Sequence, residues 1–252
     1  MKRSQGKAIP VEDSPHKSHI LVVSSAVREL CDHSLMLQRF GYRVCAAQTG
    51  AQALELAALS RPSLVIADRT LPDMDCLDLL RKLSSDARSI SMIVILPVAA
   101  ECVEACNFEL GGALPALTKP VAAEDLYRTV QAAIEPTPRA TIRIRTSLPV
   151  KVNNTLLDCN RGECAIDLSA QGMYVRMLKP FRPNRNLKVT VNIGSRAVTA
   201  GATVLYTRAF GDGPSASPGM AVKFTAIEPD DQAFLASYIR GEVTKEPGNA
   251  ER

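Results

Sequence analysis

The sequence predicts two domains of different fold class: an α/β domain with a parallel sheet, followed by an all-β barrel with a C-terminal helix. Three observations support this division. The chain has 252 residues, of which 46% are apolar, so it is too long for one average domain and apolar enough for two cores. Short β-branched runs alternate with amphipathic segments up to residue 134. Beyond residue 138, apolar residues recur at every second position.

The N-terminal residues 1–17 are polar, and they include Pro10 and Pro15. We expect a disordered leader here, because few side chains can be buried and the apolar core of a signal peptide is missing. The chain also lacks an apolar run of the roughly 18 residues that a membrane helix needs. We therefore expect no membrane insertion and a cytoplasmic location.

The first domain, residues 18–134, is predicted to contain five strand–helix units. The predicted strands are 20–23, 44–46, 64–67, 92–96 and 113–117. The predicted helices are 30–40, 51–59, 77–83, 101–110 and 123–134. Continuous apolar strands of this kind are typical of a parallel sheet with helices on both faces.

Three stretches of this domain lie in a predicted strand or directly after one. The first strand reads ILVV, the third continues as LVIADRTLPDMD around Asp68, and the fifth is followed by LTKP, which contains Lys119. Residues 18–134 resemble the receiver domain of bacterial response regulators, a flavodoxin-like fold of two-component signalling with its site at the carboxyl ends of the strands. The resemblance implies that Asp68 matches the phosphoacceptor and Lys119 the lysine that pairs with it.

The chain departs from this family at three positions. Ser24 and Ser25 stand where the family has an acidic pair that holds Mg²⁺, and a hard divalent ion needs carboxylate oxygens. Pro97, or Val98 in a shifted alignment, replaces the expected hydroxyl residue, and Ala116 lies near the expected aromatic residue. Without the metal, phosphoryl transfer loses its charge neutralisation. We therefore predict a pseudo-receiver that binds no Mg²⁺.

In a pseudo-receiver, Asp68 is a strand-end carboxylate that pairs with Lys119 and closes a turn. Phosphorylation of Asp68 is the alternative. The family also forms dimer contacts at the end of this domain, so the resemblance implies a docking surface for an unidentified protein partner or for a homodimer.

Residues 135–138, Glu-Pro-Thr-Pro, form a linker stiffened by two prolines. Beyond it, segments 187–193, 198–206 and 220–224 alternate apolar with polar residues, as half-buried antiparallel strands do. Turn signals such as Asn153-Asn154 and Gly194-Ser195 separate them. A helix from Pro229 to Gly241 is predicted to cap the barrel, and residues 242–252 are expected to be a disordered tail.

Two motifs and a charge difference distinguish the second domain, residues 139–241. One motif is Arg139-x-x-x-Arg143, and the other is Asp167-x-Ser169-x-x-Gly172. Residues 18–134 carry ten basic and thirteen acidic side chains, a net charge of −3, whereas residues 135–242 carry fourteen and nine, a net charge of +5. This difference favours an anionic partner for the second domain.

Three stretches place these motifs in a family. RATIRIRTSLPVKV carries the first motif, IDLSAQGMYV carries the second, and PGMAVKF precedes the final helix. Residues 137 to about 241 resemble the PilZ domain, the bacterial receptor module for the second messenger cyclic di-GMP. Two motifs in the right order are far more specific than either alone.

The resemblance implies a nucleotide-binding site made by Arg139, Arg143, Asp167, Ser169 and Gly172. Arginine can bind a guanine edge through two hydrogen bonds, which lysine cannot copy. The Asp167 carboxylate can accept from guanine N–H groups, and Ser169, two residues on, lies on the same face of the strand. Gly172 is expected to permit a tight, positive-φ turn and a close approach of the ligand.

Two other interpretations of these motifs stay open. The arginines can be solvated linker charges, and the second motif can be a hairpin turn whose Asp and Ser bond their own backbone. The joint occurrence of both motifs with the strand pattern favours the interpretation that they form a ligand site. Arg145 alternates with Arg143 on the same face and can assist.

The predicted function is a cyclic di-GMP effector with no enzymatic activity, in which the ligand changes interdomain or partner contacts. No catalytic triad, phosphate-binding loop or paired-carboxylate site is evident in the sequence. The alternatives are a phosphorylation-controlled response regulator that uses Asp68 and a ligand-free protein-interaction adaptor. The aromatic content of 4%, with no Trp, argues against a nucleic-acid partner.

The seven cysteines are scattered singly through apolar segments, which is not the pattern of a disulfide framework. We expect most of them to be small buried side chains. No CxxC pair occurs, and the three histidines lie far in sequence from the pairs Cys102/Cys106 and Cys159/Cys164, so we predict no metal site.

Overall fold

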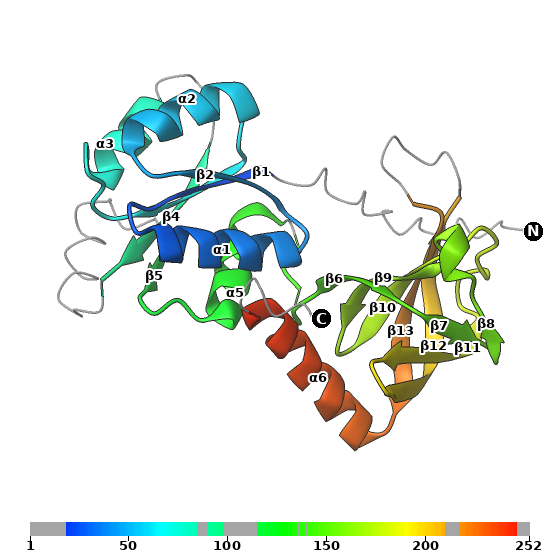
Figure 1. Cartoon of the computed structure of the whole chain (residues 1–252). Helices are drawn as coiled ribbons and strands as arrows, with labels where there is room; N and C mark the ends of the chain where they lie inside the picture. The colour runs from blue at the N-terminus through cyan, green and yellow to red at the C-terminus, as the bar shows by residue number, and fades with distance from the viewer. Residues whose placement is uncertain are drawn as a thin grey trace, which may run out of the picture.

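A computed structural model describes residues 19–84, 90–97, 115–135, 137–139, 141–209 and 217–245. It consists of an α/β lobe and a β-barrel lobe, with the C-terminal helix lying across both (Figure 1). The predicted leader 1–17 and the predicted helix 101–110 lie outside the described residues.

The α/β lobe contains a parallel five-stranded sheet with the strand order β2-β1-β3-β4-β5. Its strands are β1 (His19–Val23), β2 (Arg43–Ala47), β3 (Leu64–Asp68), β4 (Ser91–Leu96) and β5 (Ala116–Thr118). The described helices are α1 (Val27–Arg39), α2 (Gly50–Ser60), α3 (Cys76–Ser84) and α5 (Ala123–Ile134). This is the flavodoxin-like order, and it confirms the predicted fold.

The alternation of strand side chains explains why the strands are apolar throughout. Leu21 and Val23 pack in one cluster with α2 and α3, whereas Ile20 and Val22 pack in another with α1 and α5. Because helices cover both faces, every residue of β3 is buried. The carboxyl ends of β1 and β3 therefore meet at one edge of the sheet, where Asp68 lies.

The barrel lobe is one antiparallel sheet with the strand order β6-β9-β10-β13-β12-β11-β7-β8. The strands are β6 (Ile144–Leu148), β7 (Val150–Val152), β8 (Thr155–Leu156), β9 (Cys164–Ser169), β10 (Gly172–Arg176), β11 (Asn186–Ile193), β12 (Arg196–Arg208) and β13 (Gly219–Ile227). A 3₁₀ turn, η1 (Cys159–Arg161), precedes β9.

The segment of β6 and β7 closes this sheet into a barrel. β6 pairs with β9, whereas β7, which follows directly after Pro149, pairs with β11. One nearly continuous segment thus joins the two ends of the row from β9 to β11, as closure of a barrel requires. Asn153 and Asn154 form the predicted turn after β7, with positive φ angles of 48° and 68°.

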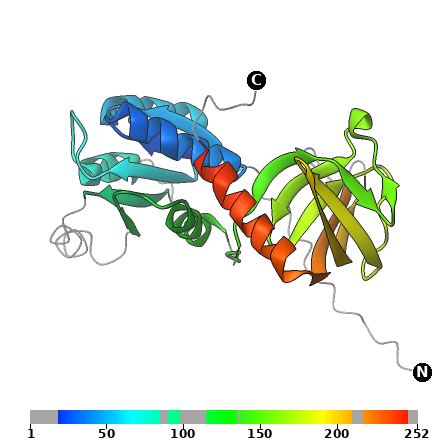
Figure 2. The ribbon, with the colours of Figure 1, turned by 60° about the horizontal axis from the view of Figure 1, so that its bottom comes forward.

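The C-terminal helix α6 (Pro229–Thr244) differs from its prediction in length and position. It packs on β6 and β9 of the barrel and also on α1 and α5 of the other lobe (Figure 2). Residues 242–244, which were expected to lie in a disordered tail, belong to this helix. The cause is Val243, which is fully buried in a cluster that Met36 and Phe40 of the α/β lobe join.

The α/β lobe also satisfies the end of this helix. Arg39 donates a hydrogen bond from Nη1 to the carbonyl oxygen of Val243, at 2.8 Å. Arg240 forms an ion pair with Glu124 of α5, at 3.0 Å. The two lobes are therefore joined by apolar and by polar contacts. None of the described helices is long and apolar enough to cross a membrane.

Candidate functional site

The two linker arginines have different environments. Arg143 is exposed, whereas Arg139 is half-buried against the α/β lobe. The backbone N–H of Arg139 donates to Oε1 of Gln131, at 3.3 Å. Burial would lower the pKa of the Arg139 guanidinium, but Tyr127 and Glu135 favour its charged form and raise that pKa. Residues of helix α5 and Glu135 directly after it thus contact Arg139.

The Gln131 side chain is held in one orientation because both its amide nitrogen and its amide oxygen form hydrogen bonds. It is 1% exposed, and its Nε2 donates to the hydroxyl oxygen of Tyr42, at 2.5 Å. The other end accepts from the Arg139 backbone. Gln131 therefore bridges the turn after α1 and the linker, and its orientation is set by two different segments of the chain.

Tyr127 faces both linker arginines. Burial raises the pKa of its phenol, and the nearby Arg139 guanidinium and Arg143 backbone N–H lower it by smaller amounts. Among the described residues, no group makes a hydrogen bond of acceptable geometry with this buried oxygen. We call Tyr42, Tyr127, Gln131 and Glu135 the Arg139 cluster.

The sequence motifs give no hint of the Arg139 cluster. One signal is visible in retrospect: Tyr127 and Gln131 are four residues apart, on the helix face that buries Leu126 and Val130. Polar groups on the buried face of a helix need partners. The sequence does not show that the partner is a linker arginine.

On the barrel, Asp167 is paired with Arg145. Nη1 of Arg145 donates to Oδ1 of Asp167 at 3.1 Å, and their side chains are 41% and 33% exposed. The two residues are opposite each other on β6 and β9. The Arg145 side chain also packs against the turn after α1, since a Cβ added to Gly41 would lie 3.5 Å from its Cγ. This pair therefore lies at the border between the lobes.

Ser169 is used within its own turn. It is 4% exposed, and its hydroxyl donates to the carbonyl oxygen of Gly172 at 3.0 Å. The same oxygen accepts from the backbone N–H of Gln171, at 3.4 Å. This is the hairpin-turn arrangement that the sequence left open for the second motif.

The positive-φ turn expected at Gly172 is wrong. Its φ is not in the left-handed region, so it does not serve a positive-φ turn. A Cβ at this position would lie 2.3 Å from the carbonyl oxygen of Val222 on the adjacent strand β13. Glycine is required because the neighbouring strand β13 approaches closely within the same sheet.

A cavity of about 160 Å³ lies between α5, the linker, the β9–β10 turn and α6. Its lining includes Tyr127, Thr141, Ile142, Ala170 and Ile239. Ligand pockets usually measure roughly 300–1,000 Å³. A dinucleotide cannot enter this cavity while the lobes keep the present arrangement.

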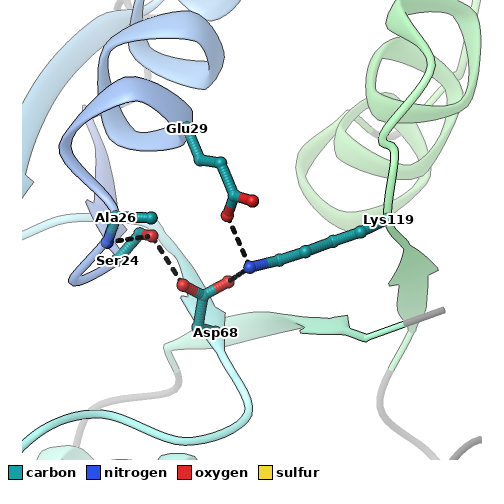
Figure 3. A network of polar contacts seen from close by, with 5 residues as sticks. All are labelled: Ser24, Ala26, Glu29, Asp68 and Lys119. Carbon is teal, nitrogen blue, oxygen red and sulfur yellow. Dashed lines mark hydrogen bonds and ion pairs between the residues drawn. The ribbon is translucent and has the colours of Figure 1, made fainter. Parts of the chain in front are cut away.

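A second polar site lies at the sheet edge of the α/β lobe (Figure 3). Asp68 is 7% exposed, and its Oδ2 accepts from the Ser24 hydroxyl at 2.5 Å. Nζ of Lys119 lies 3.0 Å from Oδ1 of Asp68 and 2.5 Å from Oε2 of Glu29. The expected Asp68–Lys119 pair is therefore present. The Ser24 contact and the whole role of Glu29 were missed by the sequence reasoning.

Lys119 offsets part of the negative charge at this edge. Burial would lower the pKa of Lys119, but its contacts with Glu29 and Asp68 outweigh burial and raise it. One ammonium group thus lies between two carboxylates, and a neutral hydroxyl satisfies the other Asp68 oxygen. Within the described ranges, no group of three or more His, Cys, Asp or Glu side chains is suited to a metal ion.

The cysteines are less uniformly buried than expected. Cys76 and Cys164 are buried, whereas Cys31 and Cys159 are exposed. All five described cysteines are free thiols.

Comparisons with known proteins assign both lobes. The model of the response regulator receiver domain matches residues 20–131, and that of the PilZ domain matches residues 137–241. Protein PilH of Pseudomonas aeruginosa is 27% identical over 118 residues, which span 46% of this chain and 98% of that protein. Response regulator MprA of Mycobacterium sp. strain KMS is 34% identical over 120 residues, or 47% of this chain and 51% of that protein. The chain thus spans about half the length of MprA.

Solved structures with partial similarity include the chemotaxis response regulator CheY4 of Vibrio cholerae. It is 24% identical, with a TM-score of 0.42, and the match covers 46% of this chain and 98% of that one. The inhibitor of motility MotI/DgrA of Bacillus subtilis is 19% identical with a TM-score of 0.37, over 44% of this chain and 53% of that one. With both family models in sequence order and the two predicted folds observed, the chain is a response regulator receiver domain followed by a PilZ domain.

Proposed function

We propose that this protein is a signalling effector that binds cyclic di-GMP at the PilZ barrel and linker, and that it has no enzymatic activity. The PilZ match makes this ligand the expected one. The observation that carries the proposal is the Arg145–Asp167 pair on the barrel surface, next to the exposed Arg143. These groups supply charge-assisted donors and an acceptor in one exposed place.

The chemistry of these groups suits a guanine nucleotide. Arg143 can bind a guanine edge or a phosphate with two parallel hydrogen bonds. The Asp167 carboxylate, held by Arg145, can accept from guanine N–H groups. Ser169 supports the turn and is not needed as a direct ligand, since its hydroxyl is satisfied by Gly172 and Gln171.

Ligand binding would change the contacts between the domains. Arg139 can reach the ligand only if it leaves the Arg139 cluster on the receiver domain. Arg145 packs against Gly41 of the same domain, so a ligand beside Asp167 also meets the domain border. Ligand binding would then produce a new arrangement of the two domains. A protein partner or a second copy of the chain can recognise that arrangement.

In this proposal, the receiver domain is a pseudo-receiver that takes no phosphoryl group. Lys119 offsets part of the negative charge of Asp68 and Glu29, and the acidic pair that would hold Mg²⁺ is replaced by Ser24 and Ser25. The domain then acts as a docking unit for the barrel and for partners.

Titration calorimetry with cyclic di-GMP tests the proposal directly. We expect the wild type to bind and Arg143→Ala to weaken Kd by roughly 10- to 100-fold, the equivalent of one or two hydrogen bonds to charged groups. Arg182→Ala is the matched control, because it removes an exposed arginine outside both motifs. Absence of binding by the wild type would overturn the proposal.

A further inference from the structure

We propose that helix α5 of the receiver domain competes with cyclic di-GMP for Arg139, so that Tyr127, Gln131 and Glu135 set the affinity of the PilZ domain. This inference rests on the proposed function. It adds residues outside the PilZ motifs to the determinants of ligand affinity, and it assigns the receiver domain a role that needs no phosphorylation.

Arg139 contacts the receiver domain through both its backbone and its side chain. Its backbone N–H donates to Gln131, and its side chain is half-buried beside Tyr127. Gln131 cannot follow the linker outward, because it is almost fully buried and also donates to Tyr42. A ligand that draws the linker at Arg139 away from α5 therefore breaks this hydrogen bond.

The receiver domain surrounds the Arg139 guanidinium with an acidic residue and two tyrosines. Glu135 favours the charged guanidinium through its negative charge, whereas Tyr127 and Tyr42 lie near it as neutral phenols. The phenol oxygen of Tyr127 is buried and has no hydrogen-bond partner among the described residues. Departure of Arg139 leaves this oxygen without the positive group that faces it, which makes departure costly.

The Arg145–Asp167 pair and the Arg139 cluster border the same turn of the receiver domain. Arg145 lies against Gly41, and Tyr42, the partner of Gln131, is the next residue. The turn after α1 therefore borders both the Arg139 cluster and the Arg145–Asp167 pair. A ligand on the barrel and the receiver domain in its present position meet at the same place.

The quantitative consequence follows from a two-state equilibrium. If only the state with Arg139 released binds fully, the apparent Kd is the intrinsic Kd divided by the fraction of released molecules. Weakening the Arg139 cluster raises that fraction and tightens binding. By reciprocity, bound ligand weakens docking of the receiver domain by the same factor.

The test compares Kd for cyclic di-GMP, measured by calorimetry, in the wild type, Tyr127→Phe and Gln131→Met. Each variant loses one polar contact to Arg139 and keeps nearly the same volume, so we expect Kd to fall by roughly 2- to 10-fold. Tyr238→Phe on α6 makes the same chemical change outside the cluster and should leave Kd unchanged. Glu135→Gln, at a half-buried position, is a second test should the buried variants fail to fold.

A ligand-free readout separates this inference from the proposed function. Hydrogen exchange of the peptide that contains Arg139 should be faster in Gln131→Met than in the wild type, because the acceptor of that N–H is gone. If the wild type does not bind cyclic di-GMP, the proposed function fails. The hydrogen-exchange comparison then still shows whether Gln131 holds the Arg139 backbone. If the wild type binds, and the variants match it in both Kd and exchange, the competition is overturned.

Discussion

The amide oxygen of Gln131, in the last turn of receiver helix α5, lies 3.3 Å from the backbone nitrogen of Arg139, the first arginine of the PilZ linker motif. A residue of the receiver domain thus contacts a residue expected to bind ligand in the PilZ domain. This contact places the border between the domains at the candidate ligand site. In the proposed function, this contact couples ligand binding on one domain to the position of the other.

Phosphorylation of Asp68 is predicted not to occur. Lys119 and Ser24 engage its two oxygens, and the acidic pair that would hold Mg²⁺ is replaced by serines. Incubation with acetyl phosphate and Mg²⁺, followed by intact mass spectrometry, should show no added phosphoryl group. An added group in the wild type that disappears in Asp68→Asn would show that the receiver is active.

Gly172→Ala is predicted to destabilise the PilZ domain even in the absence of ligand. Its new methyl group would lie 2.3 Å from the carbonyl oxygen of Val222, so the barrel wall must shift, at a cost of about 1–3 kcal/mol. Gly241→Ala is the matched control: its Cβ meets no atom within 4 Å, and alanine favours the helix by up to about 1 kcal/mol. Urea unfolding measures both changes. Equal stability of Gly172→Ala and the wild type would contradict the role assigned to Gly172.

The last turn of α6 is predicted to stabilise the contact between the domains. A chain that stops after Gly241 loses Val243, whose full burial stabilises by roughly 1.5–3 kcal/mol, and it also loses the acceptor of the Arg39 hydrogen bond. A chain that stops after Lys245 keeps both and is the control. The shorter chain should show a lower free energy of unfolding and faster hydrogen exchange in α1. The same values for both chains would argue against this contact.

Stability is predicted to fall as the pH decreases below about 6.5 because of His33. This side chain is 6% exposed, and burial lowers its pKa despite the opposing effect of Asp68 and Glu29. Below the unfolded pKa, the unfolded chain takes up a proton that the folded chain resists, so folding loses free energy as the pH falls. Urea unfolding between about pH 7.5 and pH 5.5 should show this decrease in the wild type and a smaller one in His33→Gln. Identical pH dependence in the two proteins would exclude this role of His33.

The fold could be predicted because its signals are local. The continuous apolar strands and the change to a period of two indicate a parallel sheet and then a barrel, whichever residues meet later. The end of α6 could not be predicted in this way. Val243 is one apolar residue in a polar tail, and its burial depends on Met36 and Phe40, which are about two hundred residues earlier in the chain.

Some residues of the candidate sites could also be predicted from local sequence motifs, whereas others depend on contacts between distant segments. Motifs give the Asp68–Lys119 pair because strand ends of a known sheet meet at one edge. Glu29 and Gln131 are absent from any motif, because their roles depend on how a helix face meets another segment. Gly172 was expected to serve a positive-φ turn, whereas the atom that excludes a side chain there is a carbonyl oxygen of β13.

Fluorine NMR of the protein labelled with 3-fluorotyrosine tests most directly whether the ligand takes Arg139 from the receiver domain. The chain has five tyrosines, and single Tyr→Phe variants assign their signals. Tyr42 and Tyr127 belong to the Arg139 cluster, whereas Tyr174 and Tyr206 lie in the barrel. On titration with cyclic di-GMP, the Tyr42 and Tyr127 signals should shift and saturate together with the calorimetric binding curve. Saturated binding that leaves both signals unchanged would contradict the account.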